Sequence, residues 1–204
     1  MRLQFFAAVL PASTLAIFIA AALALPARAQ QPTMPSYDPV AVADGVRQLL
    51  SRTPDREIDG LFHALHGAMR EPREADAICG LFEDGTDRGF EGLNRAAMQL
   101  GETSRQRFVD AIAHAVVAGF EGQPQTLDRA AAEQALKSNG ARAAMLHDGF
   151  SAGLVEGATR QARCTTLGQM LDVLAQRPQA ERVLVTRLLL EQGLQQAAAQ
   201  ATSP

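Results

Sequence analysis

Apolar residues recur at intervals of three and four along most of the sequence after residue 38, and this spacing constrains the fold more than any other feature. Val42, Val46, Leu49 and Leu50 form one such stripe. The spacing places the side chains on one face of an α-helix. No sustained run of β-branched residues alternates with polar residues, as half-buried strands would require. The sequence therefore predicts an all-α fold, a single compact domain of about seven helices.

Capping residues and prolines predict where these helices begin and end. Asp38-Pro39 and Thr53-Pro54 each combine a capping side chain with a proline at a first helical position. Further helices are expected from near Pro72, from near Ser104 to Phe120, from Thr126 to about Ser138 with Asn139-Gly140 as its end, from Leu146 to Gly157, from Thr166 to before Pro178, and from Ala180. We expect one domain over residues 38–196 and a frayed tail over 197–204.

Glycines recur every four positions at Gly149, Gly153 and Gly157. In a helix they would lie in one row and let another backbone approach closely. Each interior glycine costs a helix on the order of 1 kcal/mol relative to alanine, so the row predicts a close helix crossing that offsets this cost. Gly85 and Gly89 repeat the pattern 64 residues earlier, which suggests that the two glycine-faced helices cross each other. A ligand or partner lying in the groove is the alternative.

The first 29 residues have the pattern of a secretory signal peptide. Arg2 precedes an apolar stretch that runs from Phe5 to Leu25, and Ala27-Arg28-Ala29 is a small-residue cleavage site. Residues 30–37 are polar and proline-containing, which is typical of a flexible lead-in. An uncleaved membrane anchor is the alternative, because about twenty apolar residues could span a bilayer.

Cleavage after Ala29 would leave 175 residues with no further membrane contact. Residues 1–29 contain two arginines and no acidic residue, so the remainder carries 17 basic and 22 acidic side chains, a net charge of −5 with histidine neutral. A nucleic-acid binder would show a clustered positive surface instead. We therefore predict a periplasmic protein without a nucleic-acid partner.

Only two cysteines, Cys79 and Cys164, occur in the chain. Disulfides persist in the compartments that exported proteins reach. The sequence favours a bond between Cys79 and Cys164, with two free thiols or an intermolecular bond as the alternatives.

Catalytic and metal-binding patterns give little support for an enzyme. His63 and His66 share one helical face with Glu57, Asp59 and Glu71 nearby, but no HExxH motif or second histidine cluster completes a metal site. No nucleophile elbow, P-loop or haem motif is present. We predict no catalytic residue, no metal and no cofactor.

The helix from Ala180 has apolar residues around more of its circumference than one packing face uses. Either the core surrounds this helix or part of it meets another chain. We predict a partner face at Leu184, Leu188, Leu189 and Glu191, which would serve a homodimer or a complex with another protein.

A resemblance to a known family arises over about residues 146–194. The pattern Gly-Phe-x-x-Gly-x-x-Glu-Gly at 149–157 is followed by Cys164, by Thr-x-Gly-Gln-x-x-x-Val-Leu at 166–174, by Pro178 and by a closing apolar helix. This order resembles the Rap/Tai family of periplasmic immunity proteins of type VI secretion. The resemblance implies a protein that binds and neutralises a peptidoglycan-degrading effector, a cell-wall amidase or muramidase. A periplasmic structural, adaptor or chaperone-like helical protein without a toxin partner is the alternative.

Overall fold

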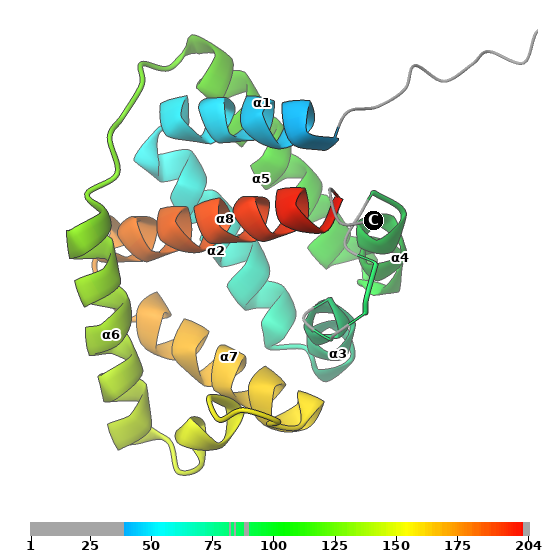
Figure 1. Cartoon of the computed structure of the whole chain (residues 1–204), viewed down its shortest axis with the longest axis vertical. Helices are drawn as coiled ribbons and strands as arrows, with labels where there is room; N and C mark the ends of the chain where they lie inside the picture. The colour runs from blue at the N-terminus through cyan, green and yellow to red at the C-terminus, as the bar shows by residue number, and fades with distance from the viewer. Residues whose placement is uncertain (1–38, 82, 84, 88–89, 202–204) are drawn as a thin grey trace, which may run out of the picture. The chain divides into compact units, whose positions relative to one another are not determined.

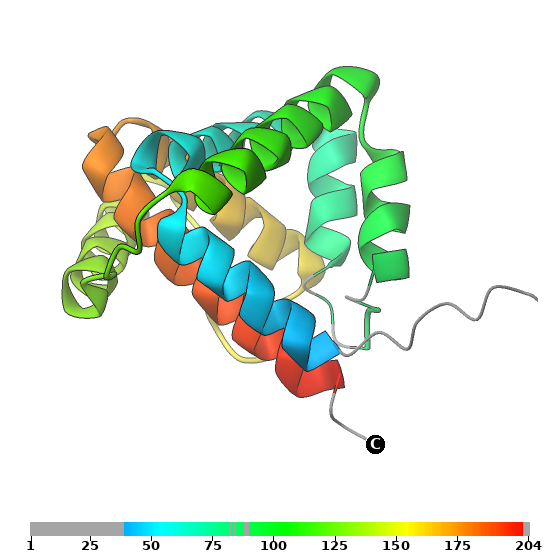
Figure 2. The ribbon, with the colours of Figure 1, turned by 90° about the horizontal axis from the view of Figure 1, so that it is seen from above.

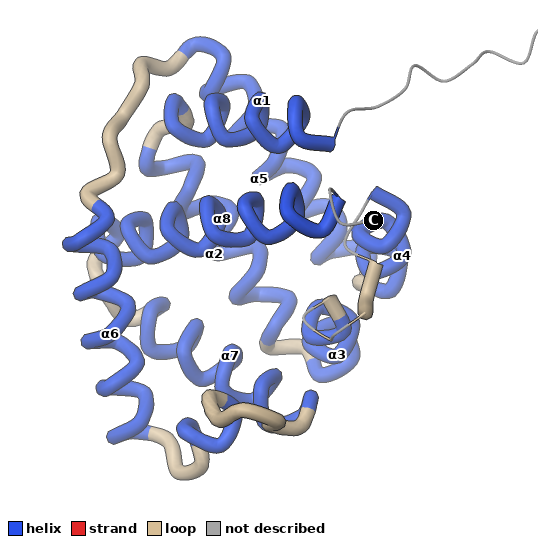
Figure 3. Tube along the Cα trace, viewed as in Figure 1, coloured by secondary structure: helices blue, strands red, loops and turns tan. Residues whose placement is uncertain are grey.

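The computed structural model describes residues 39–81, 83, 85–87 and 90–201. The expected signal peptide at 1–29 and lead-in at 30–37 lie outside the described residues. The described part is entirely helical where it has regular structure, without a strand, which confirms the all-α prediction (Figure 3). Its helices are α1 (Pro39–Arg52), α2 (Asp55–Met69), α3 (Pro72–Gly80), α4 (Phe90–Gln99), α5 (Glu102–Glu121), α6 (Arg129–Leu146), the short 3-10 helix η1 (Phe150–Gly153), α7 (Arg160–Ala175) and α8 (Gln179–Ala201).

Helix α8 lies at the centre of the arrangement and contacts α1, α2, α6 and α7 (Figure 1). Helix α1 runs antiparallel to α8 along its length, and α2 crosses behind them to reach α3 and α7. The main core forms where α2, α3, α7 and α8 meet. Its buried members include Phe62, Ile78, Cys79, Leu171, Leu174 and Val185. The broad apolar band of α8 is therefore explained by neighbours on several sides.

A disulfide between Cys79 and Cys164 joins α3 to α7, with the two Cα atoms 5.5 Å apart. The predicted pairing within one chain is thus present in the structure. Cys79 is buried in the core, so the bond anchors the short helix α3 to the rest of the domain.

Three expected helix boundaries were wrong because side chains have other partners. Asn139 does not end a helix: α6 continues to Leu146, and the buried Asn139 amide donates to Ala135 O (2.8 Å) and to Glu181 Oε1 (2.6 Å). Thr159, not Thr166, caps α7, and Thr166 Oγ1 instead donates to the carbonyl oxygen of Phe150 at 2.6 Å. At the carboxyl end, α8 continues to Ala201, past the expected start of the frayed tail at 197, and 202–204 lie outside the described residues.

The predicted glycine-faced helices are also wrong. Residues 147–159 form turns and η1 in place of an α-helix, and Gly149 and Gly157 have φ angles of +82° and +72°. Such angles favour glycine because they bring a Cβ too close to the backbone. Gly85 also lies in a turn, at φ +75°, and Gly89 is outside the described residues. The four-residue spacing therefore reflects turn geometry and not a helix face.

Gly153 alone among the described members of this set makes a close approach. A Cβ placed there would lie 2.5 Å from the carbonyl oxygen of Ala162 and closer still to Thr166 Oγ1. The backbone of η1 thus lies directly against α7.

We predict that Gly153→Leu lowers the free energy of unfolding by about 2 kcal/mol or more, because it forces a side chain between η1 and α7. Ala152→Leu is the matched control, since Ala152 is exposed in the same short helix. Urea unfolding of both variants measures the difference. Equal midpoints and slopes for the two variants would contradict the close packing at Gly153.

Candidate interaction surface

The partner face predicted on α8 does not form one exposed surface. Leu188 is fully buried, Leu184 is half-buried, and Leu189 is exposed on a different side. Glu191 Oε2 accepts a hydrogen bond from Arg129 Nη2 at 2.6 Å. The prediction was wrong for Leu188 because α8 is surrounded by four other helices, and a sequence does not show which helix is central.

Glu181, which we also expected at an exposed polar rim, has partners inside the domain. Its carboxylate accepts hydrogen bonds from Asn139 and from Arg177. Burial alone would raise the pKa of Glu181, but the hydrogen bonds and the positive charge of Arg177 outweigh burial, so the pKa is lowered. Glu181 therefore ties α6 to α8 as a carboxylate.

The largest exposed apolar side chains of the long helices lie instead on α5. Val109, Ile112, Val117 and Phe120 are exposed by 60, 52, 59 and 74 %, respectively. We call these four residues the α5 stripe. Their spacing of three, five and three residues places them on one side of the helix. Figure 2 shows α5 on the outside of the domain.

The opposite face of α5 consists of small residues, and this explains why the large ones remain outside. Ser104, Ala115 and Gly119 are buried against α1 and α2. A Cβ at Gly119 would lie 2.9 Å from the carbonyl oxygen of Leu49, so the two backbones are in close contact. Val109, Ile112 and Phe120, which belong to the apolar stripe seen in the sequence, thus face outward.

An exposed helix face of this kind is suited to binding another protein. Single exposed apolar residues are common, whereas a contiguous apolar patch on a monomer often marks an interaction site. Sequence analysis missed the surface because it treated the larger apolar residues as the packing face. The usable signal was the second row of small residues on the opposite side of α5, at Ala111, Ala115 and Gly119.

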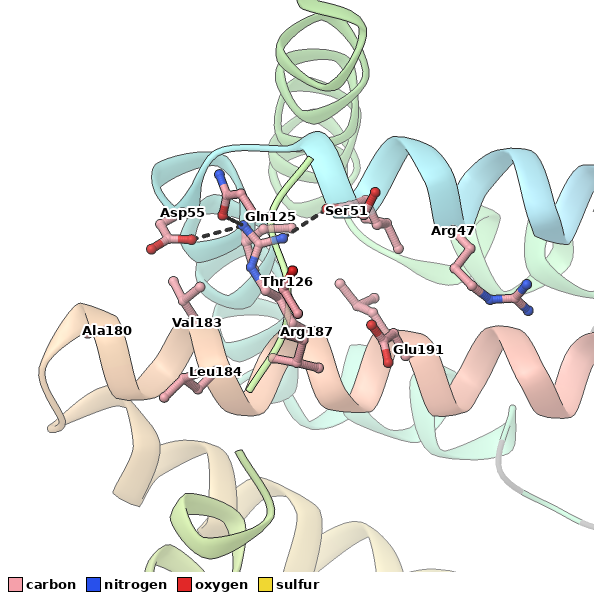
Figure 4. Close-up of a pocket in the computed structure, with 14 residues that line it drawn as sticks. Arg47, Ser51, Asp55, Gln125, Thr126, Ala180, Val183, Leu184, Arg187 and Glu191 are labelled. Carbon is pink, nitrogen blue, oxygen red and sulfur yellow. Dashed lines mark hydrogen bonds and ion pairs between the residues drawn. The ribbon is translucent and has the colours of Figure 1, made fainter. Parts of the chain in front are cut away.

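A cavity of about 310 Å³ lies between α1, α8 and the loop that joins α5 to α6 (Figure 4). Leu184 and Glu191, two residues of the predicted partner face, line it together with Arg187. The Arg187 side chain is only 10 % exposed. Its guanidinium donates to the carbonyl oxygens of Leu50 and Thr53, at 2.8 and 2.6 Å.

The same guanidinium also donates to Asp55 Oδ1 at 2.9 Å and to Gln125 Oε1 at 3.0 Å. The backbone N–H of Gln125 donates to the carbonyl oxygen of Ser51 at 2.7 Å. Arg187 therefore holds the α5–α6 loop against α1 and α2, and its role at the cavity is structural.

The two histidines considered for a metal site have separate partners. His66 Nε2 lies 2.8 Å from Asp172 Oδ1, and His63 Nε2 lies 3.5 Å from Asp59 Oδ2. Within the described residues, no group of three or more histidine, cysteine, aspartate or glutamate side chains is arranged to hold a metal ion.

None of the helices that the structure describes is long and apolar enough to cross a membrane. Comparison of the chain with family models, curated proteins and solved structures finds no match.

Proposed function

We propose that this protein is exported to the periplasm, where it binds and neutralises a peptidoglycan-degrading effector through the α5 stripe. The exposure of that stripe is the observation that carries the proposal. A convex apolar helix face suits recognition of another protein, because small-molecule and catalytic sites are usually concave.

Two further features support the place and the partner. The pattern of residues 1–29 is that of an export signal, and the disulfide between Cys79 and Cys164 is a bond that persists in an oxidising compartment. The choice of a cell-wall amidase or muramidase as the effector comes from the resemblance of residues 146–194 to the Rap/Tai immunity proteins. The stripe itself suits an adaptor or chaperone-like protein equally, so the effector must be tested directly.

We expect residues 30–204, purified with the disulfide intact, to inhibit peptidoglycan cleavage by at least one member of a panel of type VI amidases and muramidases. Ile112→Asp is expected to weaken that inhibition by at least about 30-fold, because it places a charge at the centre of an apolar contact. The measurement is dye release from labelled peptidoglycan over a titration of the inhibitor.

Met145→Asp and Leu189→Asp are the controls, because each puts the same charge on an exposed apolar residue outside α5. Both are expected to inhibit as well as the parent. Inhibition that survives Ile112→Asp but is lost in Leu189→Asp would move the contact from α5 to α8. If no hydrolase of the panel is inhibited, the immunity function is wrong and the adaptor alternative is favoured.

A further inference from the structure

The α5 stripe is a narrow ridge. Val109 and Phe120 are eleven residues apart, so the ridge is about 16 Å long, and its four side chains cover about 140° of the helix circumference. Three of the four are β-branched or aromatic residues next to a close backbone contact on the other side of the helix, so the ridge is stiff before binding. Partners that bind such a helix face present an apolar groove.

The two flanks of the ridge differ in charge. Asp110 and Glu121 are eleven residues apart and therefore lie on the same side of α5, next to Val117. Both are exposed, and within the described part of the chain neither forms an ion pair. Arg105 lies on the opposite flank, beside Ile112. The ridge thus has one acidic flank and one basic flank.

We infer that the partner encloses α5 in an apolar groove whose one lip is basic, and that this lip faces Asp110 and Glu121. The inference rests on the proposed function only in that the chain acts by binding a protein. The net charge of −5 that remains after removal of residues 1–29 would favour encounter with such a lip. Opposite charges at the rim of an interface raise the association rate more than the affinity.

A second copy of this chain fits the ridge less well than a groove does. The exposed ridge covers on the order of a few hundred Å², whereas stable interfaces bury about 800 Å² on each partner. Two α5 helices would touch only along the ridge, while a groove also covers both flanks. In an antiparallel pair related by a two-fold axis, Asp110 and Glu121 of one copy would face the same carboxylates of the other, which is unfavourable.

Photo-crosslinking in cells that export the full chain tests the inference. A benzophenone amino acid replaces Val117, and the control places it at Met145, which is exposed on α6. We expect position 117, but not 145, to crosslink to one other protein, which is then identified and purified. Its binding to the purified chain is measured by surface plasmon resonance at several salt concentrations.

The expected result has two parts. Val109→Asp weakens binding at least 30-fold, whereas the double variant Asp110→Lys and Glu121→Lys slows association about tenfold at low salt and leaves dissociation nearly unchanged. Glu156→Lys, an exposed charge reversal on the loop before α7, is the control and leaves both rates unchanged.

Several outcomes would overturn the inference. They are a crosslink between two copies of the chain, no crosslink from position 117, and an association rate that the double variant leaves unchanged or raises. A partner that meets both expectations but cleaves no peptidoglycan supports the groove and refutes the immunity function. A hydrolase that is inhibited regardless of both α5 variants has the opposite meaning.

Discussion

Asp59→Asn is expected to lower the free energy of unfolding by about 3 to 5 kcal/mol, because it leaves a buried arginine without its anion. Arg182 Nε and Nη2 each donate to one carboxylate oxygen of Asp59, both at 2.7 Å. The two side chains are only 13 and 12 % exposed. This two-bond pair joins α2 to α8 beside the main core.

Arg182 has few ways to escape the loss of Asp59. Its Nη1 donates to the carbonyl oxygen of Arg177 at 2.5 Å, and its guanidinium lies 5.8 Å from the centre of the Phe62 ring. The hydrogen bonds from Arg182 to Asp59 raise the pKa of the arginine above its ordinary value. The arginine therefore stays charged, and the single variant leaves that charge poorly solvated inside the protein.

Two controls make the measurement specific. Asp44→Asn breaks the exposed pair between Asp44 and Arg47 and is expected to cost less than about 1 kcal/mol. The double variant Asp59→Leu and Arg182→Met removes both charges, and it is expected to recover most of the lost stability. Urea unfolding at neutral pH compares all three variants with the parent. A loss in Asp59→Asn no larger than in Asp44→Asn would show that the pair is solvated in solution.

The sequence predicted the fold class because the signals that define helices are local. Apolar spacing and cap-plus-proline pairs act within one or two turns, so the starts of α1, α2 and α3 near Pro39, Thr53-Pro54 and Pro72 were predicted closely. The pairing of Cys79 with Cys164 followed from a count of two in a chain with an export signal.

The errors occurred where a residue's role depends on a distant part of the chain. Asn139 looks like a helix end until Glu181, 42 residues away, supplies a partner for its amide. Thr166 looks like a cap until the carbonyl oxygen of Phe150 approaches it. Glycines at a helical interval can equally mark turns, because Gly149 and Gly157 need positive φ angles that a spacing does not reveal.

The candidate surface was missed for a related reason. On α5 the larger apolar residues and the small ones form two faces, and hydrophobicity favours the larger face as the buried one. The close approach of Gly119 to Leu49 reverses this choice, because only the small face lets α5 lie against α1 and α2. Which face a helix buries is decided by the distance to its neighbours, and that distance is a tertiary property.

Loss of the disulfide is expected to lower the free energy of unfolding by about 4 to 5 kcal/mol in the double variant Cys79→Ala and Cys164→Ala. The bond links residues 85 positions apart, and a closed loop of this length removes much of the conformational entropy of the unfolded chain. The expected loss is a large share of the stability of a typical domain. Guanidinium unfolding of the oxidised parent and the double variant measures it.

The reduced parent is the control that isolates the covalent bond, because it keeps both sulfur atoms in the core while the crosslink is absent. It is expected to unfold close to the double variant, and any remaining difference reports the small cavities left by alanine. The loss should be greatest locally at α3, which has nine residues and is too short to be stable without its anchor to α7. Hydrogen exchange that accelerates first in α3 on reduction would agree with this, whereas equal stability of the oxidised and reduced parent would contradict the role of the bond.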